Sequence, residues 1–537
     1  MRTGDRAAQK PLYRRLRLVR MASQLGFLLL FLFLFVNTDY SGSDTIQYAV
    51  NLLFRIDPLL AITAMLAVRA VIALMLPALL LVGLSLLLGR FFCGWVCPLG
   101  SLVDGVQPAM KHGRRRQTTL FPGLAMSLLL VVLVSALLGL PLAGYVDPFS
   151  ILVRGLAQAV YPASHNMAES FFTMTYLHAP AWVNQITEPL YGFLKETVLP
   201  FERKYFALSL LSLAVLAAVF LAEAVQRRFF CRNICPLGAL LGWFARLGPT
   251  GLRGGDDDCG ACRLCSRICR MGAIDERRRI DPQRCSLCMD CLVRCPRQVI
   301  FFRSFLPGSR GVGVSLSRRR LVGTLALGCV IPPMLGVRRL TAAPDPLLIR
   351  PPGALAEVEF LQRCVRCAEC IQVCIGNGLQ PVLLEAGIEG IFSPHLVART
   401  GYCEFNCTLC GQVCPTGAIR ELTRAEKHRT KIGNAWFDTD RCLPYARGIP
   451  CIVCEEHCPT PDKAIKFRTV VMVDDLTGQQ QEIRHPFIVD ELCIGCGICE
   501  TKCPLPGRAA VFVTSDGEMR NPDNILPRKG ETDQWGY

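Results

Sequence analysis

Histidine is scarce in this sequence: the chain has 7 among 537 residues, and none lies within its long apolar stretches. A haem b held inside a membrane by two histidines therefore lacks its ligands. The chain also contains no CxxCH, no GxGxxG after a predicted strand, and no GxxxxGKS or GxxxxGKT. These absences argue against c-type haem, nicotinamide, flavin and ATP chemistry.

Charged residues are also few. They make up 19% of the chain, against 51% for hydrophobic residues, and the mean hydropathy is +0.34. Because a soluble globular chain carries more charge, part of this one is expected to lie in lipid. The net charge is +16, but many basic residues flank apolar segments. That placement indicates membrane orientation rather than nucleic-acid binding.

Four apolar stretches predict membrane helices. The second is too long for one straight span and is interrupted by Arg69 and Pro77, so its first part is predicted to be re-entrant or tilted. Basic loops alternate with a loop, residues 37–58, whose only basic residue is Arg55, which predicts that both ends of the bundle are cytoplasmic. The four stretches are Leu18–Val36, Leu59–Leu88, Leu120–Leu142 and Tyr205–Val225.

The membrane part is duplicated. Asp57-Pro58 precedes a CxxxCP motif within Phe91–Gly100, and Asp147-Pro148 precedes the same motif within Phe229–Gly238. Parallel repeats place equivalent motifs on one side, so both CxxxCP pairs are predicted at the cytoplasmic surface. The second copy carries an insertion, about residues 165–203, whose aromatic side chains are expected along the outer interface.

The cysteines are numerous and grouped, since all 29 except Cys329 fall into short runs. The two runs of the first cysteine-rich region both read CxxCxxCxxxC and predict cubane 4Fe-4S clusters, in which three sulfurs share a tight loop and the fourth reaches the neighbouring cluster. Zinc needs only two CxxC pairs and leaves the third cysteine unexplained. The first run is Cys259, Cys262, Cys265 and Cys269, and Cys269 is predicted to bind the cluster of the second run. The second run is Cys285, Cys288, Cys291 and Cys295, and Cys295 is predicted to bind the cluster of the first run.

A second cysteine-rich region contains four further runs, and sixteen sulfurs predict four cubanes. Six 4Fe-4S clusters are therefore expected in the chain. Two runs have a widened first gap, and the spacing leaves open whether sequential runs pair or the first pairs with the fourth. The runs are Cys364, Cys367, Cys370, Cys374; Cys403, Cys407, Cys410, Cys414; Cys442, Cys451, Cys454, Cys458; and Cys493, Cys496, Cys499, Cys503.

The CxxxCP motifs contribute four more cysteines: Cys93, Cys97, Cys231 and Cys235. Related by the repeat, they are candidates for one further metal site at the membrane surface. The alternative is that each motif starts a helix and keeps its thiols reduced and buried. Both interpretations stay open on the sequence alone.

The resulting fold class is multi-domain: an α-helical membrane bundle of four or five spans with two bacterial-ferredoxin-like α+β iron–sulfur modules. The expected domains are residues 1–250 for the membrane part, 251–310 for a two-cluster module, 311–356 for an apolar segment and linker, and 357–537 for a four-cluster module.

These motifs resemble known families. The paired CxxxCP motifs followed by a two-cluster tail, through Cys295, resemble NapH-type membrane ferredoxins and, more loosely, NosR-type proteins. The part from Cys364 to Cys503, including Cys403–Gly417, resembles NapG and MauM ferredoxins. Together the two resemblances cover nearly the whole chain and imply a natural fusion, although Arg270 and Ile375 replace the proline that usually follows the fourth cysteine.

The resemblance implies quinol oxidation at the bacterial inner membrane and electron delivery to an exported oxidoreductase or cytochrome. Ser317-Arg318-Arg319 before an apolar run resembles a twin-arginine export signal, which places the first module in the cytoplasm and the second outside. A wholly cytoplasmic protein with a buried hairpin is the alternative, favoured by Pro332-Pro333. A membrane redox sensor or maturation factor of the NosR type is the rival function.

Residues for a quinone site are sought among charges in or near the spans, because such charges are costly to keep. Arg69, Asp57, Asp147 and Glu223 are the candidates. Each Asp-Pro pair also has the composition of a helix start, with aspartate as the cap and proline in the first turn. We therefore expect both aspartates to act as caps.

Overall fold

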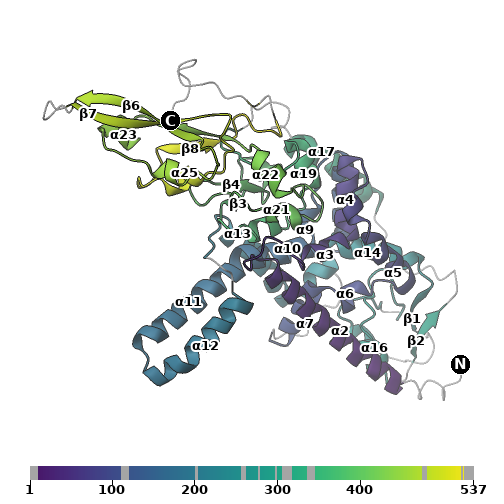
Figure 1. Cartoon of the computed structure of the whole chain (residues 1–537). Coiled ribbons are helices and arrows are strands. Elements are labelled where there is room, and N and C mark those ends of the chain that lie inside the picture. The colour runs from purple at the N-terminus through teal and green to yellow at the C-terminus, as the bar shows by residue number, and fades with distance from the viewer. Residues whose placement is uncertain are drawn as a thin grey trace.

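The computed structural model describes residues 10–109, 120–199, 203–254, 262–275, 278–296, 299–304, 317–335, 345–473, 480–521 and 524. Figure 1 shows a helical part, coloured purple to teal, between two cysteine-rich parts. The first ferredoxin module carries strands β1 and β2, and the second carries the green and yellow elements from α19 to β8.

The sequence repeat is also a structural repeat. Each copy begins with a helix of 14 residues or more, followed by a short helix and then by a helix that starts at the Asp-Pro pair. An apolar helix comes next, and a helix that starts in the CxxxCP motif ends the copy. The first copy contains α2 (Lys10–Asn37), α3 (Asn51–Arg55), α4 (Pro58–Val68), α5 (Ala78–Leu88) and α7 (Pro98–Val106); the second contains α8 (Leu124–Leu137), α9 (Ala143–Val146), α10 (Pro148–Gly155), α13 (Ser209–Leu221) and α14 (Pro236–Leu247).

The break expected between Arg69 and Pro77 is present. Arg69 closes α4 in the left-handed conformation, with φ of 58°, and a short η1 (Ala73–Met75) precedes α5. Among the described helices, one stretch, Pro11–Asn37, is long and apolar enough to cross a membrane. The apolar helices of the other three predicted spans are shorter, so the four-span bundle stays a prediction.

The insertion of the second copy forms a helical hairpin. After η3 (Leu156–Val160), helices α11 (Tyr161–His178) and α12 (Ala181–Thr197) project from the body of the molecule (Figure 1). Large apolar side chains are exposed on both helices, among them Phe171, Trp182 and Phe193. Such a surface suits an apolar neighbour, and its predicted place along the membrane interface stays a prediction.

Short elements build the cysteine-rich modules, because most of their chain is loop around cysteines. In the first module β1 (Thr250–Gly254) pairs antiparallel with β2 (Ile300–Ser304) beside α15 (Leu264–Ile268) and α16 (Asp290–Arg294). The second module contains α19 (Glu357–Arg363), α20 (Glu369–Gln372), β3 (Leu379–Pro381), η6 (Ile388–Gly390), β4 (Pro394–Leu396), α21 (Leu409–Gln412), α22 (Arg424–Arg429), β5 (Asn434–Phe437), α23 (Leu443–Arg447), α24 (Val453–Glu456), β6 (Ile465–Val473), β7 (Gln480–Ile488), α25 (Ile498–Lys502) and β8 (Val511–Thr514). Its strands pair antiparallel as β3 with β4, β5 with β8 and β6 with β7.

The helix between the modules, α17 (Arg318–Leu335), packs along α8 of the helical part. The contact is close, since a Cβ on Gly328 would lie 2.8 Å from the Cβ of Val134. The arginines of the predicted export signal form the first turn of α17.

The two modules dock on different sides of the helical part (Figure 1). The first module meets the CxxxCP end, where Trp95 Nε1 donates to the carbonyl of Leu287 at 3.1 Å. The second module meets the Asp-Pro end, where Arg366 Nη1 donates to the carbonyl of Pro141 at 2.7 Å. Buried Lys204 adds a second tie there, because its ammonium contacts both Asp39 and the carbonyl of Gln372.

Docking of the second module depends on close backbone approach at Gly144. A Cβ at this position would lie 2.2 Å from the carbonyl oxygen of Val365, and a backbone oxygen cannot move aside cheaply. We expect Gly144→Ala to weaken this junction by about 1–3 kcal/mol, seen as faster hydrogen exchange in α19 and the loop that follows it. Gly83→Ala in α5 is the control, because its Cβ meets nothing within 4 Å. Equal exchange in both variants would contradict this docking.

Candidate metal centres

Three of the CxxCxxC loops share one local conformation. In three runs, the residues immediately before and after the middle cysteine are left-handed: Leu287 and Met289, Arg366 and Ala368, and Gly495 and Gly497. Left-handed residues are uncommon outside glycine, so their recurrence on both sides of a cysteine marks a required turn. The turn winds the chain around the middle cysteine and brings three thiols to one side of the loop.

In the first module, one cavity is lined by Cys269 together with Cys285, Cys288 and Cys291. The last cysteine of the first run therefore lies with the first three of the second run, which is the arrangement that a crossover requires. Cys295 belongs to the same buried cluster as Cys265. Cys259 lies outside the described residues.

Two cavities in the second module show the same exchange. One is lined by Cys374 with Cys403, Cys407 and Cys410, and the other by Cys414 with Cys364, Cys367 and Cys370. The first and second runs of this module are therefore partners.

The third and fourth runs also pair with each other. The pKa of the Cys442 thiol is raised to about 11, mainly by burial, with nearby Cys451 and Cys503 contributing to the rise. Burial likewise raises the pKa of Cys496 to about 12, with Cys493 and Cys458 among the thiols close enough to contribute. Each fourth cysteine thus lies beside the neighbouring run, and the pairing of sequential runs replaces the alternative that the spacing left open.

Within the described residues, no three or more His, Cys, Asp or Glu side chains are placed to hold one metal ion. This applies to the ferredoxin runs and to the CxxxCP cysteines alike.

The CxxxCP motifs start helices, as one interpretation of the sequence predicted. Cys97 caps α7 and Cys235 caps α14, and their sulfurs accept hydrogen bonds from the backbone N–H groups of Gly100 at 3.4 Å and Gly238 at 3.3 Å. All four motif cysteines are buried, with exposed fractions of 8%, 8%, 8% and 4% in chain order, and they belong to one core.

Two arginines at equivalent positions of the repeat connect the motifs. Arg90 precedes the first motif and donates from Nη2 to the carbonyl of Cys231 at 3.0 Å. Arg228 precedes the second motif and donates from Nη1 to the carbonyl of Cys93 at 2.9 Å. Each repeat therefore holds the backbone of the other, and an Arg-Phe-Phe-Cys sequence in both copies was the signal that sequence reasoning missed.

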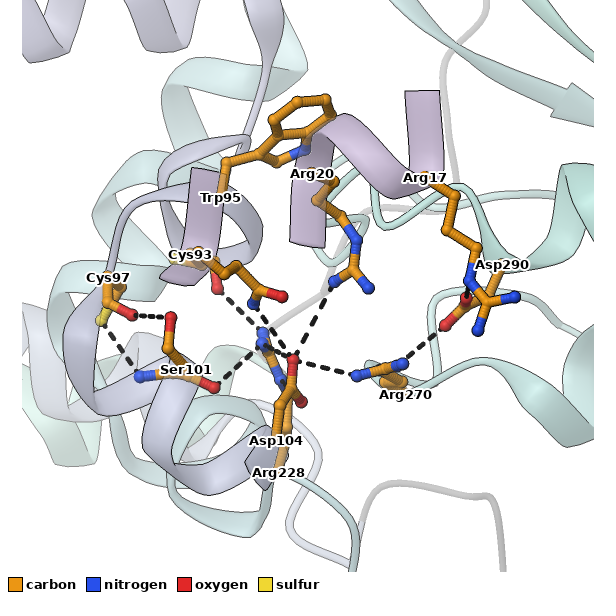
Figure 2. A network of polar contacts seen from close by, with 12 residues as sticks. Arg17, Arg20, Cys93, Trp95, Cys97, Ser101, Asp104, Arg228, Arg270 and Asp290 are labelled. Atoms are coloured by element: carbon orange, nitrogen blue, oxygen red, sulfur yellow. Dashed lines mark hydrogen bonds and ion pairs between the residues drawn. The ribbon is translucent and has the colours of Figure 1, made fainter. Parts of the chain in front are cut away.

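A charge network joins this region to the first module (Figure 2). Asp104 of α7 accepts from Arg228 at 2.9 and 2.7 Å and pairs with Arg270 at 3.0 Å. Arg270 also donates to Asp290 at 2.8 Å. Burial alone would raise the pKa of Asp104, but the Arg228 and Arg270 guanidinium groups outweigh it and hold that pKa below its usual range. Arg270, which replaces the usual proline, is thus a docking residue.

The four candidate residues for the quinone site lie in different parts of the structure. Asp57 caps α4 through bonds from the N–H groups of Leu59 at 2.8 Å and Leu60 at 3.2 Å, and Asp147 caps α10 through Ser150 N–H at 2.9 Å, so the predicted capping is confirmed.

The structure also brings Asp57 and Asp147 together, close enough for each buried carboxyl group to act on the other electrostatically. Arg69 is exposed at the far end of α4, about 16 Å along the helix. Glu223 is buried at the CxxxCP end, where it accepts from the N–H of Arg228 at 2.5 Å.

Comparison with known proteins fits these sites. A family described as a 4Fe-4S binding domain matches residues 70–117, 206–253 and 410–434, and the first two segments contain the CxxxCP motifs. The ferredoxin-type protein NapG of Escherichia coli is 36% identical over 133 residues, which are 24% of this chain and 56% of NapG. Protein NirI of Paracoccus denitrificans is 31% identical over 215 residues, 40% of this chain and 26% of NirI. No solved structure matches.

The loops, the cavities and these relatives define an iron–sulfur electron-transfer protein of the ferredoxin type. The methylamine utilization ferredoxin-type protein MauM of Methylobacillus flagellatus is 32% identical over 166 residues, which are 30% of this chain and 68% of MauM. The chain belongs to this family of ferredoxin-type proteins. It spans about half the length of NapG.

Exchange of cysteines between runs predicts which double variants lose one cluster and which lose two. Cys374→Ser with Cys407→Ser alters one cavity, so we expect a loss of about 4 iron atoms per chain. Cys374→Ser with Cys367→Ser alters two cavities, and the loss should be about 8. Iron and acid-labile sulfide in the purified chain measure both. Equal losses from the two pairs, or the reverse order, would show that the runs pair differently.

Proposed function

We propose that the chain is a membrane-bound quinol dehydrogenase subunit, a natural fusion of a NapH-type membrane ferredoxin with a NapG/MauM-type ferredoxin. Six 4Fe-4S clusters on the ferredoxin cysteines pass electrons to an exported redox partner. The observation that supports this best is the docking of the two modules on different sides of the helical part (Figure 1). A wholly one-sided carrier has no need of that arrangement.

The path of the chain supports export of the second module. It leaves the first module at β2, runs through α17 alongside α8, and enters the second module at the Asp-Pro end. The arginines at the start of α17 stay with the first module in the cytoplasm, where basic residues accumulate. In this orientation the second module faces the periplasm.

Asp57 and Asp147 are the residues that we assign to the quinol proton. Both are fully buried, and each has one carboxylate oxygen on a helix cap and one without a hydrogen-bond donor from the protein. Two buried carboxylates placed this close repel each other, so one of the two is expected to hold a proton. The pair can therefore hold a proton or accept one.

The pair lies beside the second module. Ser150, in the first turn after Asp147, donates from Oγ to the carbonyl of Val365 at 3.3 Å, and Val365 follows Cys364. Oxidation of a quinol to a quinone would break two O–H bonds and release two protons and two electrons, and the pair would take the protons one at a time, passing the first on before it accepts the second. Bound 4Fe-4S clusters supply one-electron acceptors, and the cysteine cavity next to Val365 is the near one for the released electrons.

The aspartate assignment predicts an effect on turnover that capping does not explain. Asn caps a helix as well as Asp but holds no transferable proton. We therefore expect Asp57→Asn to leave the protein folded and to slow cluster reduction by a quinol analogue about 10²–10⁴-fold. In the Arg69→Ala variant, which is changed at the exposed far end of α4, the quinol analogue should reduce the clusters at the wild-type rate. Wild-type clusters that stay oxidised with quinol but are reduced by dithionite would contradict quinol as the donor.

Sidedness is tested with reporters fused after Arg303 and after Tyr537. Green fluorescent protein after Arg303 should fluoresce in the cytoplasm whether or not the twin-arginine pathway works. Alkaline phosphatase and green fluorescent protein after Tyr537 should report the periplasm only while that pathway is intact. Cytoplasmic signal from both positions, unchanged when the pathway is disabled, would contradict export.

A further inference from the structure

The four CxxxCP cysteines, hereafter the quartet (Cys93, Cys97, Cys231 and Cys235), lie in the core that joins both ferredoxin modules. The same buried cluster includes Met271 of the first module and Cys367 of the second. Cys269 and Cys285 pack against it. The quartet therefore sits between two groups of cluster-binding cysteines rather than at a free surface.

Contacts lead from the quartet to each module. Toward the first module, Arg90 Nη1 donates to the carbonyl of Gln283 at 3.4 Å, two residues before Cys285. Toward the second module, the ring of Phe92, beside Cys93, lies tilted against the ring of Phe149, with centroids 5.9 Å apart. Phe149 precedes Ser150, whose hydroxyl bonds the loop of Cys364.

Arg90 brings a buried positive charge to the quartet. Arg90 is buried, yet no carboxylate pairs with it among the described residues; its Nε donates to the sulfur of Cys93 at 3.3 Å, and its other bonds go to backbone carbonyls. A buried cation without a counter-charge is expensive. The groups around Arg90 that can carry negative charge are the thiols of Cys93, Cys231 and Cys235 and, beyond ion-pair distance, the carboxyl group of Asp281.

The surrounding backbone is shaped to keep the guanidinium there. A Cβ on Gly238 would lie 1.9 Å from Arg90 Nη2, so any side chain would displace the arginine. Gly100, its counterpart in the first repeat, lies against the carbonyl of Cys93 and the guanidinium of Arg228. Both glycines also donate an N–H to a quartet sulfur, a kind of bond that tunes iron–sulfur clusters.

We propose that the quartet binds a seventh 4Fe-4S cluster, which relays electrons between the two modules. Four thiolates around an iron–sulfide core make an anionic group, and Arg90 with Arg228 supplies the compensating charge. A zinc ion needs four sulfurs at about 2.3 Å from one centre, and the described side chains include no such group. The relay gains and loses one electron at a time, with no bond made or broken. It does not depend on quinol being the donor.

The iron content of the full-length chain tests the site. Seven clusters predict about 28 iron and 28 sulfide per wild-type chain, and Cys93→Ser with Cys231→Ser should lower each to about 24 while the remaining cluster signals persist. Cys329→Ser, an exposed cysteine of α17, is the matched control and should stay at the wild-type value. Unchanged iron in the double variant, or zinc in place of the lost iron, overturns the proposal.

A second variant separates cluster binding from a purely structural role. Arg90→Gln keeps all four cysteines but removes the buried positive charge, so one component of the redox titration should move to lower potential while the others stay. Arg90→Lys should restore most of the shift. A titration in which no component moves, with the chain folded and the iron count unchanged, shows that Arg90 faces no cluster and overturns the assignment.

Discussion

Reciprocal hydrogen bonds between two buried arginines and the opposite repeat are the constraint on which the centre of this molecule depends. Arg90 holds the backbone at Cys231 and Arg228 holds it at Cys93. The guanidinium groups fix the two helix starts against each other, so four cysteines from distant parts of the chain share one core. Asp104 neutralises Arg228, and Arg270 joins the first module to the same carboxylate. Docking, burial and charge balance are therefore parts of one arrangement.

The ferredoxin modules, in contrast, depend mainly on local turns. Left-handed residues on both sides of a middle cysteine wind three of the CxxCxxC loops without needing a large core. The fourth cysteine then crosses to the next run, so clusters are built in pairs and each pair is a compact unit. Because cysteines from two runs line each of these cavities, the modules need only short helices and two-stranded sheets around them.

Cysteine spacing, Asp-Pro helix caps and the break at Arg69 could be predicted from the sequence, because each is a local effect of a few neighbouring residues. The pairing of runs could not, since the spacing fits more than one exchange. The structural roles of Arg90 and Arg228 could not be predicted, because arginines beside apolar segments also match the basic flanks that the positive-inside rule expects. The contact between Asp57 and Asp147 was missed because capping accounts for one oxygen of each and leaves the other unconsidered.

The central claim is that electrons cross the helical part through the quartet, and transfer across a sealed bilayer tests it most directly. The full-length chain is reconstituted into liposomes that contain ferricyanide, and dithionite is added outside. The account predicts that ferricyanide is bleached at a rate proportional to the protein incorporated, and at the protein-free rate with Cys93→Ser and Cys231→Ser together. Equal bleaching by the wild-type and double-variant chains, or none above background in either, would contradict it.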